Sequence, residues 1–442
     1  MTRAFSDWLK GLAPYAEKPV LATFLLGMSS GFPLTLVISL TGIWLSRFGV
    51  SKETVGIFAL ATTPYAWKFL WSPAIDRVPL GFLSRYFGRR RAWLVLIQAG
   101  LAVAILYLSV LDPAVDTVLI GFVVLAVGFL SASQDTVIDA YRIEVLPKDR
   151  LGHGASMVAF GYRAGNLIAG YGVLRVAESA GWSVAIALLV LLLLPGLVAV
   201  IWVGEPAHKE DPLLVRDQSL IAKAKGLEKV RLTLHEAVVL PFVEFTHRRD
   251  WLLILLFIFL FKAGDAIAAI MTGPLMVDLQ FTEGEMANAN KLVGTIALWV
   301  GIALGAVLYR VAGVYRSLAL SGILMMVTNL VFAWLATRGH DVFALAVTIG
   351  SENFATGLGT TVVIAYLSSL CNLSFTATQY ALLSSLASQA RAIMGTFSGV
   401  LAENLGWVSF FLFSTLAAVP GLIMLLLLWR RSVGVEQETG QG

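Results

Sequence analysis

Two carboxylates share one face of a predicted membrane-spanning helix, where ionised groups are costly. Asp135 and Asp139 are four residues apart, and this spacing puts both side chains on the same side of the helix. Two carboxylates this close disfavour joint ionisation, so one of them is a candidate proton carrier. The alternative interpretation is that both are hydrated near the end of the span, where they pair with Arg142 or support the packing of neighbouring helices.

Two arginines lie near the middle of predicted spans, at corresponding places in the two halves of the chain. Arg163 and Arg391 keep their charge at any physiological pH, and a guanidinium can grip a carboxylate in bidentate fashion. Each could therefore hold an anionic substrate. Each could instead close an internal salt bridge, Arg163 with Asp135 or Asp139 and Arg391 with Glu352.

Further charges within the predicted spans are Lys68, Lys262, Asp265 and Glu352. Lys262 and Asp265 are helix neighbours that could neutralise each other or act as a switch that a proton or a substrate displaces. Glu352 lies near mid-span and is a candidate for protonation. Lys68 is close enough to a membrane face to extend its ammonium toward water, and we also consider it for substrate binding.

Neutral groups complete the candidate substrate site. Gln379 adds hydrogen-bonding capacity, and Tyr65 could stack against a sugar ring, although such tyrosines more often only pack. The five histidines fall in loops or at span ends, and the sequence contains no GxxxxGK[ST] phosphate loop and no Ser-His-Asp set. We therefore expect neither an enzyme nor an ATP-driven pump, and no metal or other cofactor.

The amino-acid composition indicates a protein embedded in a membrane. Of the 442 residues, 58% are hydrophobic and 14% are charged, whereas soluble domains carry about 25% charged residues. The apolar residues gather in runs long enough to cross the hydrocarbon core as helices. We predict an all-α protein with twelve spans near residues 20–44, 54–75, 92–111, 117–140, 153–175, 183–203, 251–278, 289–309, 315–335, 341–366, 377–400 and 407–429.

The distribution of basic residues predicts the topology. If both termini are cytoplasmic, the inner segments hold 23 of the 32 Lys and Arg, and the outer segments hold five. The positive-inside rule therefore favours cytoplasmic termini. The polar stretch 204–249 divides the chain into an N-terminal bundle of six helices (1–203) and a C-terminal bundle of six helices (250–442). Part of this linker, 220–239, could be either an amphipathic helix at the membrane surface or a solvated segment.

The two halves resemble each other in their motifs. Asp76-Arg77 and the basic run at 88–91 follow the second span, and Arg310 and Arg316 follow the eighth. Gly161-x-x-x-Gly165 in the fifth span corresponds to a similar glycine pair, 395 and 399, in the eleventh, and such glycines let helices approach closely. This six-plus-six plan resembles the major facilitator superfamily, whose site lies between the two bundles.

Several longer stretches resemble the AmpG-type muropeptide permeases within that superfamily. They include TPYAWKFLWSP at 63–73, SQDTVIDAYR at 133–142, FKAGDA at 261–266 and FTATQYALLSSL at 375–386. Together they extend over nearly the whole chain, and the last is the most specific. The best-known members are longer and have extra hydrophobic segments, which are not among the twelve spans that we expect here.

The resemblance implies a monomeric importer in the bacterial inner membrane. It implies a cargo of anhydro-muropeptides, which move with protons from periplasm to cytoplasm for peptidoglycan recycling. In this interpretation Lys68, Tyr65, Arg163, Lys262, Gln379 and Arg391 bind substrate. Asp135, Asp139, Asp265 and Glu352 are the candidates for proton coupling, and Asp76, Arg77, Arg89, Arg90 and Arg142 are the candidates for a gate. The alternatives are an importer of another solute, such as a siderophore, a membrane enzyme and a sensor that does not transport. No nucleic-acid partner is expected.

Overall fold

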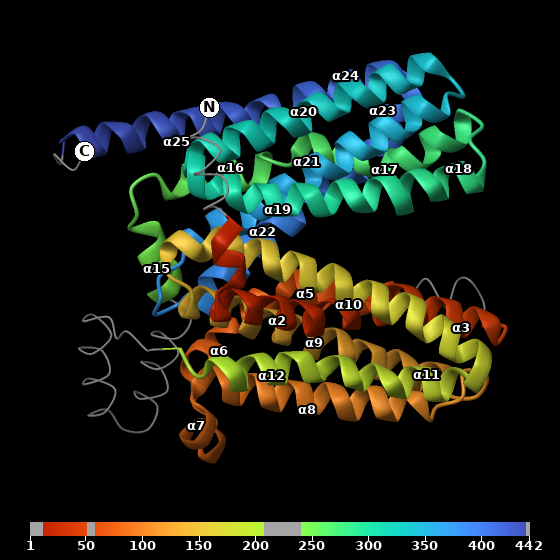
Figure 1. Ribbon diagram of the computed structural model, residues 1–442, viewed down its shortest axis with the longest axis vertical. Helices are drawn as coiled ribbons and strands as arrows, with labels where there is room; N and C mark the ends of the chain where they lie inside the picture. The colour runs from red at the N-terminus through yellow and green to blue at the C-terminus, as the bar shows by residue number, and fades with distance from the viewer. Residues whose placement is uncertain (1–11, 51–57, 207–239, 439–442) are drawn as a thin grey trace. The chain divides into compact units, whose positions relative to one another are not determined.

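The computed structural model describes residues 12–50, 58–206 and 240–438. Within these ranges every regular element is a helix, which confirms the all-α prediction (Figure 1). The chain divides into two compact units. The first contains Ala13–Glu244 and Ser368–Ser385, and the second contains Met1–Leu12, Phe245–Leu367 and Leu386–Gly442. The predicted segment 220–239 lies outside the described residues.

Most of the main helices of the first unit follow the first six predicted spans, and two short ones lie outside them, at residues 82–87 and 240–246. The main helices are α2 (Lys18–Thr35), α3 (Thr41–Arg47), α5 (Thr63–Trp67), α6 (Ser72–Arg77), α7 (Phe82–Phe87), α8 (Arg89–Ser109), α9 (Thr117–Val145), α10 (Leu151–Ala180), α11 (Trp182–Leu188), α12 (Leu194–Val203) and α15 (Leu240–Thr246), whose last two residues pass into the second unit. A π-helical turn at Leu36–Leu40 joins α2 to α3.

The main helices of the second unit follow the remaining spans. They are α16 (Trp251–Leu260), α17 (Ala263–Asp278), α18 (Glu283–Asn288), α19 (Thr295–Ala312), α20 (Val314–Arg338), α21 (Val342–Ser369), α22 (Thr376–Thr396), α23 (Ser398–Leu405), α24 (Trp407–Ala417) and α25 (Val419–Glu438). The end of α21 and the first half of α22 belong to the first unit by their contacts.

Eight helical segments of the described residues are long and apolar enough to cross a membrane: Lys18–Arg47, Arg89–Ser109, Thr117–Val145, Trp182–Val203, Trp251–Asp278, Leu292–Ala312, Val314–Arg338 and Trp407–Ser432. Each matches a predicted span. The other four predicted spans correspond to α10, to α21, to α22 with α23, and to the short helices of residues 58–77. Proline residues 64 and 73 lie in the first turn of two of those short helices, a position in which proline is well tolerated.

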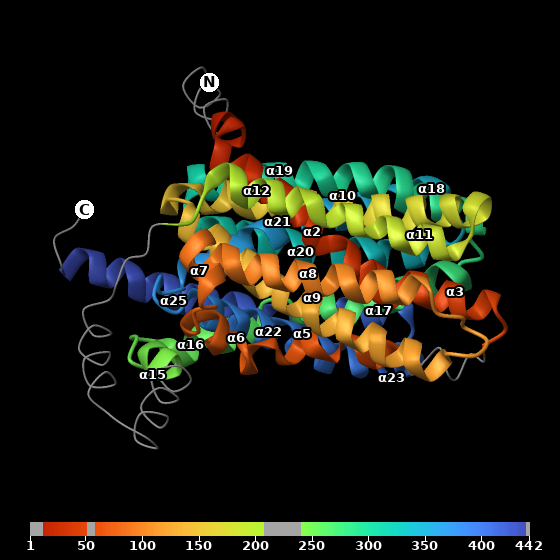
Figure 2. The ribbon, with the colours of Figure 1, turned by 90° about the horizontal axis from the view of Figure 1, so that it is seen from below.

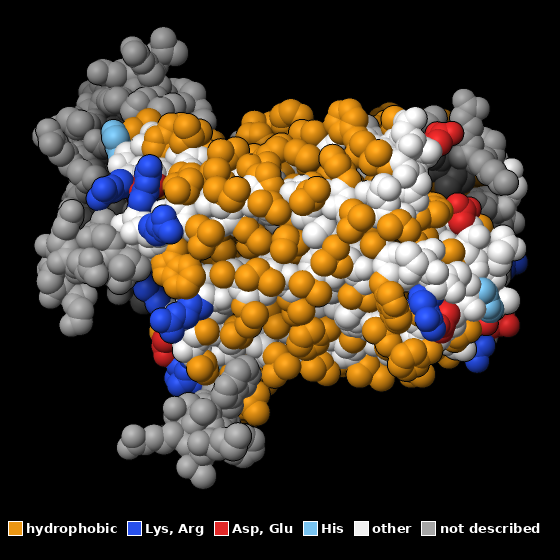
Figure 3. Space-filling view, turned by 90° about the horizontal axis from the view of Figure 1, so that it is seen from above, with side chains coloured by type: hydrophobic (Ala, Val, Ile, Leu, Met, Phe, Trp, Pro, Cys, Tyr) orange, Lys and Arg blue, Asp and Glu red, His pale blue; other side chains and the backbone are white. Residues whose placement is uncertain are grey.

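The outer surface of the helices is apolar. Large hydrophobic side chains such as Val103 of α8 and Phe122 of α9 are 68% and 66% exposed. Hydrophobic side chains cover the middle of the face drawn in Figure 3, and Lys and Arg gather toward one end of that face. A surface of this kind is stable in lipid rather than in water, which supports the membrane-spanning interpretation of the helices.

Glycines set the closest helix packing in the first unit. A Cβ atom at Gly161 of α10 would collide with the carbonyl oxygen of Phe24 in α2, and one at Gly165 would collide with that of Met28. The predicted close approach at the first glycine pair is therefore confirmed.

The second unit uses different glycines for the same purpose. Gly301 of α19 faces the carbonyl oxygen of Phe354 in α21, and Gly357 of α21 faces that of Leu298 in α19. A Cβ atom added at Gly399, which belongs to the pair predicted by analogy, would meet no atom of another helix within 4 Å. The predicted close approach is therefore not found at Gly399, and residue 395 lies outside the described side chains.

Candidate functional site

A buried carboxylate joins the end of α6 to the start of α22. Asp76 is fully buried, and its Oδ2 atom accepts hydrogen bonds from the backbone N–H of Thr378 (2.7 Å) and from the Thr378 hydroxyl (2.6 Å). Its Oδ1 atom accepts another from the N–H of Ala377 (3.1 Å). The first N–H groups of a helix have no partner within that helix, and a negative charge is favourable there. Asp76 therefore acts as an N-terminal cap for α22, although it is about three hundred positions away in the chain.

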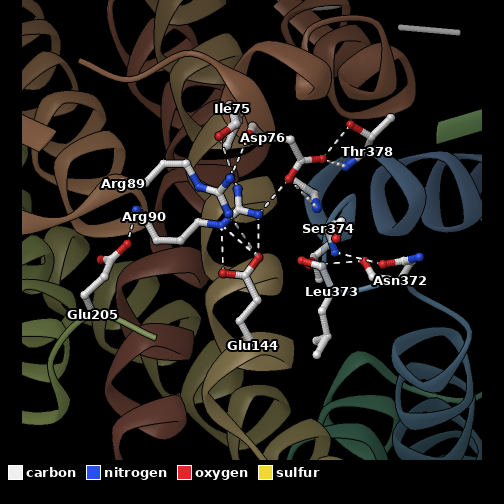
Figure 4. Close-up of polar contacts among 12 residues, drawn as sticks. Ile75, Asp76, Arg89, Arg90, Glu144, Glu205, Asn372, Leu373, Ser374 and Thr378 are labelled. Atoms are coloured by element: carbon white, nitrogen blue, oxygen red, sulfur yellow. Dashed lines mark hydrogen bonds and ion pairs between the residues drawn. The ribbon is translucent and has the colours of Figure 1, made fainter. Parts of the chain in front are cut away.

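Arg90, at the start of α8, neutralises this carboxylate. Its guanidinium is fully buried, and Nη2 lies 2.6 Å from Asp76 Oδ1 and 2.5 Å from Glu144 Oε1 (Figure 4). Arg89 Nη1 donates to the backbone oxygen of Asp76 at 2.7 Å, and Arg89 Nη2 lies 3.9 Å from Glu144. Two cations and two carboxylates thus form a compact, hydrogen-bonded cluster, which offsets the cost of burying the charges.

Glu205 completes the cluster from the segment after α12. One of its carboxylate oxygens accepts a hydrogen bond from the backbone N–H of Arg90 at 2.8 Å (Figure 4). The other accepts from the N–H of Arg91 at 3.1 Å, so that Glu205 caps α8. Arg77 directly follows Asp76 in the sequence. Its guanidinium carbon is 4.6 Å from the centroid of the Phe375 ring. The predicted gating residues 76, 77, 89 and 90 therefore gather at one end of the first unit.

A second charged cluster lies along α9. Asp139 Oδ2 is 4.0 Å from Lys68 Nζ, and Asp139 Oδ1 is 3.4 Å from Arg142 Nη2, so that one carboxylate serves two cations. Both cations are buried, with Lys68 7% exposed and Arg142 0% exposed. Arg142 also donates to the Ser368 hydroxyl at 3.0 Å. A change in the charge of Asp139 would leave both cations without this counter-ion.

The neighbouring carboxylate, one helical turn away, has a different environment. Asp135 Oδ1 accepts a hydrogen bond from the Ser30 hydroxyl at 2.6 Å. Among the described residues no Lys or Arg lies within ion-pair distance of Asp135. Two carboxylates on one helix face thus have different partners, a hydroxyl for Asp135 and two cations for Asp139.

Two other predicted substrate residues of the first unit use their polar atoms within the protein. The Tyr65 hydroxyl donates to Ser131 of α9 at 2.7 Å. The side-chain oxygen of Gln379 accepts from the N–H of Asn372 at 2.7 Å, and its nitrogen donates to the backbone oxygen of Pro241 (3.2 Å) and to the Glu244 carboxylate. Gln379 thereby ties α15 to the start of α22. Arg163 is exposed on α10.

In the second unit, Lys262 lies at a break in a spanning segment. Helix α16 ends at Leu260 and α17 begins at Ala263, and the Lys262 ammonium is 3.3 Å from the Thr360 hydroxyl in α21. A cavity of about 20 Å³ beside this break is lined by Lys262 together with aromatic rings, including Phe257, Phe261 and Tyr366. A cavity of this size holds about one water molecule.

The acidic candidates of the second unit have polar neighbours. Asp265 lies in the first turn of α17, where a negative charge is favourable for the helix. Glu352 accepts hydrogen bonds from the Asn353 amide (2.9 Å) and the Thr356 hydroxyl (3.2 Å). Arg391 belongs to α22 by its backbone, and its side chain lies outside the described part of the structure.

The sequence of this chain matches the model of the Major Facilitator Superfamily over residues 20–349. The chain belongs to this superfamily. Among its relatives, the anhydromuropeptide permease of Escherichia coli is 36% identical over 404 residues, which cover 91% of this chain and 78% of the relative. The putative transporter AmpG 4 of Rickettsia felis is 35% identical over 408 residues and covers 92% and 95% of the two chains. Within the superfamily the chain therefore belongs to the AmpG-type permeases.

Solved structures agree with the superfamily fold. The human organic anion transporter MFSD10 matches with a TM-score of 0.66 and 14% identity, over 92% of this chain and 99% of that one. The proton:xylose symporter XylE matches with a TM-score of 0.63 and 13% identity, over 96% and 95% of the two chains. At such low identity the likeness concerns the fold alone. The named relatives of this AmpG-type chain are permeases and transporters rather than enzymes.

Several residues of these charged clusters were missed from the sequence. Glu144 and Glu205 hold the arginines of the first cluster, and Ser30, Ser368 and Thr378 bind charged groups. Glu144 was the most accessible to prediction, because it lies five residues after Asp139 near the end of α9 and faces the basic run at 88–91. The hydroxyl residues carried no distinguishing signal, since serine and threonine are common in membrane helices.

Proposed function

We propose that this chain imports anhydro-muropeptides, GlcNAc-anhydroMurNAc and its peptides, from periplasm to cytoplasm together with protons, for peptidoglycan recycling. The protein would act as a monomer in the bacterial inner membrane with both termini cytoplasmic. The observation that carries this proposal is the 36% identity, over 91% of the chain, to a relative named anhydromuropeptide permease. The excess of basic residues in the predicted inner segments supports the orientation.

The proposed substrate residues suit the chemistry of such a cargo. Muropeptides carry carboxylates and sugar hydroxyls, and Lys68, Arg163, Lys262 and Arg391 would supply cations from both of the proposed halves, 1–203 and 250–442. Tyr65 and Gln379 would add an aromatic face and an amide. Because the described contacts of Gln379 tie it to α15, its substrate role requires those contacts to open during transport.

We propose that Asp139 is the group through which proton and substrate are coupled. In the structure it faces both Lys68 and Arg142. Protonation would remove the negative charge and leave two cations available for a substrate carboxylate. Each proton that enters the cell gains about 2.3 kcal/mol per 100 mV, which can drive the import of an anion against the membrane potential. Asp135, Asp265 and Glu352 remain further candidates for proton coupling.

The cluster around Asp76 is the proposed gate. In the proposed halves, Asp76 belongs to the N-terminal bundle and Thr378 to the C-terminal bundle, and their hydrogen bonds would hold the cytoplasmic end closed. Opening by rocking of the halves would break these bonds and expose Arg77, Arg89 and Arg90. Arg142 would take part through its bond to Ser368.

Uptake of a labelled anhydro-disaccharide into membrane vesicles tests the proposal. We expect accumulation when the outside is acidic and little accumulation when the proton gradient is collapsed. Vesicles that contain the Asp139→Asn variant provide the matched control for residual proton-driven uptake. Absence of uptake at every pH, with the protein present in the vesicles, would remove the muropeptide as cargo.

A further inference from the structure

The short helix α7 projects from the first unit and carries two exposed aromatic rings. Phe82 and Tyr86 are four residues apart on one helix face, 72% and 75% exposed, with ring centroids 4.9 Å apart. Leu83 and Phe87 form another face and are half-buried. In both Figure 1 and Figure 2, α7 lies beside the start of α8, and Figure 1 shows it projecting from the neighbouring helices of its unit.

Specific contacts hold α7 in this position. Gly81 and Gly88, at φ +51° and +87°, form the turns at its two ends, and such positive φ values favour glycine. The Trp93 indole N–H donates to the backbone oxygen of Val78 at 2.9 Å. The Arg91 guanidinium carbon lies 5.8 Å from the Phe87 ring centroid. The exposed rings are therefore presented by a fixed backbone.

The position of α7 along the membrane normal follows from its neighbour. The membrane-spanning segment of α8 starts at Arg89, two residues after α7 ends. Aromatic rings with a polar atom, such as tyrosine, accumulate at this boundary between hydrocarbon and headgroups. Arg85 lies on the same short helix, is exposed, and has no ion-pair partner among the described residues. An arginine at this level can reach a lipid phosphate while its stem stays in the apolar layer.

From this geometry we infer that α7 is a membrane-interface anchor: Phe82 and Tyr86 insert among the lipid headgroups while Arg85 binds the phosphate of an anionic phospholipid. The inference is independent of what the protein transports. Two exposed rings and an exposed cation on a fixed helix at the start of a span match a lipid surface in both polarity and charge. Because α7 is followed within three residues by the buried Arg90, lipid contact would also stabilise the charged cluster around Asp76.

A nitroxide at position 82 tests the depth of the anchor. The chain has a single cysteine, so Cys371→Ala supplies a background into which Phe82→Cys, Val103→Cys and Val115→Cys are introduced one at a time. Val103 on α8 is 68% exposed and serves as the lipid-facing control, and Val115 in the α8–α9 connection is 80% exposed and serves as the water-facing control. Collision rates with oxygen and with a water-soluble nickel chelate are measured in vesicles.

We expect the ratio of oxygen to nickel collisions at position 82 to be several-fold above that at position 115 and below that at position 103. A label at Tyr86→Cys should give the same order. A ratio equal to that at position 115 would show that α7 stands in water. Low collision rates with both reagents would show that a protein surface covers it. Either result overturns the inference.

The charge component has its own test. The label at position 82 is compared in vesicles of phosphatidylcholine alone and in vesicles that also contain phosphatidylglycerol. We expect phosphatidylglycerol to lower the nickel collision rate further, and Arg85→Gln to abolish this difference. Arg47→Gln, an exposed arginine at the end of α3, is the matched control and should retain it. If Arg85→Gln also retains the difference, Arg85 does not bind the headgroup.

Discussion

Asp76 of α6 caps the first turn of α22 by accepting hydrogen bonds from both the backbone N–H and the hydroxyl of Thr378. The same carboxylate is the counter-ion of a buried arginine at the start of α8. One side chain therefore combines a helix cap with a salt bridge. The consequences of losing its charge can be measured.

Asp76→Asn should lower the free energy of unfolding by about 3 kcal/mol, because it leaves part of the charge of Arg90 uncompensated and turns an amide group toward donors. Thermal unfolding of the purified protein in detergent measures the change. Asp149→Asn is the control, since Asp149 pairs with Arg150 at the surface and should change stability by less than about 0.5 kcal/mol. Equal effects of the two substitutions would contradict a buried cap.

Arg90 and Glu144 should be energetically coupled. Arg90→Gln removes the cation that contacts both buried carboxylates and leaves only the more distant Arg89, so we expect a loss of about 3–5 kcal/mol. Adding Glu144→Gln should restore part of this loss, because it removes one of the two like charges. A double-mutant cycle on unfolding free energies gives the coupling. Additive losses would mean that the short distance between the two groups does not carry a strong interaction.

Asp139→Asn should separate transport from proton coupling. The neutral amide resembles the protonated acid, so exchange of labelled substrate across the membrane should continue while accumulation driven by a pH gradient is lost. Vesicle uptake and exchange assays distinguish the two. Asp112→Asn, at an exposed position before α9, should leave both activities unchanged. Unaltered accumulation in Asp139→Asn would show that this residue is not required for coupling.

The glycine contacts between α2 and α10 should be sensitive to a single methyl group. Gly161→Ala drives a Cβ atom into the Phe24 carbonyl and should cost about 1–3 kcal/mol of stability. Gly399→Ala adds the same atom in open space, so alanine's higher helix propensity should raise stability by up to about 1 kcal/mol. Opposite shifts of the melting temperature are expected, and a destabilising Gly399→Ala would show an undetected contact there.

The contribution of Glu285 to stability should depend on pH. The pKa of the Glu285 carboxyl is held below its ordinary value by a hydrogen bond from the Thr282 backbone N–H, by His340 and by the Thr282 hydroxyl. Because the folded state lowers this pKa, the stabilisation is present above the ordinary value and is lost as the pH falls through the lowered one. Glu285→Gln should therefore melt below wild type at neutral pH and converge with it in acid. A constant difference at all pH values would exclude this linkage.

The helices could be predicted from the sequence because their signal is local. Apolar runs of about twenty residues fix membrane spans, and Gly161 and Gly165 at a spacing of four identify a packing face without any knowledge of the partner. The eight strongly apolar segments of the described residues all fall on predicted spans. The breaks within spans were not foreseen. At Lys262, for example, the only helix-breaking residue beside the interruption between α16 and α17 is Gly264, and a single glycine is too common in membrane helices to predict a break.

The partners of the charged residues could not be predicted in the same way. Spacing places Asp135 and Asp139 on one helix face, but whether each meets a cation or a hydroxyl depends on which helices lie opposite. Lys68 reaches Asp139 from a segment about seventy positions earlier, and Asp76 meets Thr378 from about three hundred positions away. Only the packed structure brings such groups together. For this reason Glu144 and Glu205 were not predicted as members of the cluster around Asp76.

The hydrogen bonds that cap α22 also provide a way to measure how often the proposed gate opens. The backbone N–H groups of Ala377 and Thr378 donate hydrogen bonds to Asp76. Their protons can therefore exchange with solvent deuterium only while these hydrogen bonds are broken. Their exchange rates would therefore count openings of this end of the protein directly, without a dye, a label or a transported molecule.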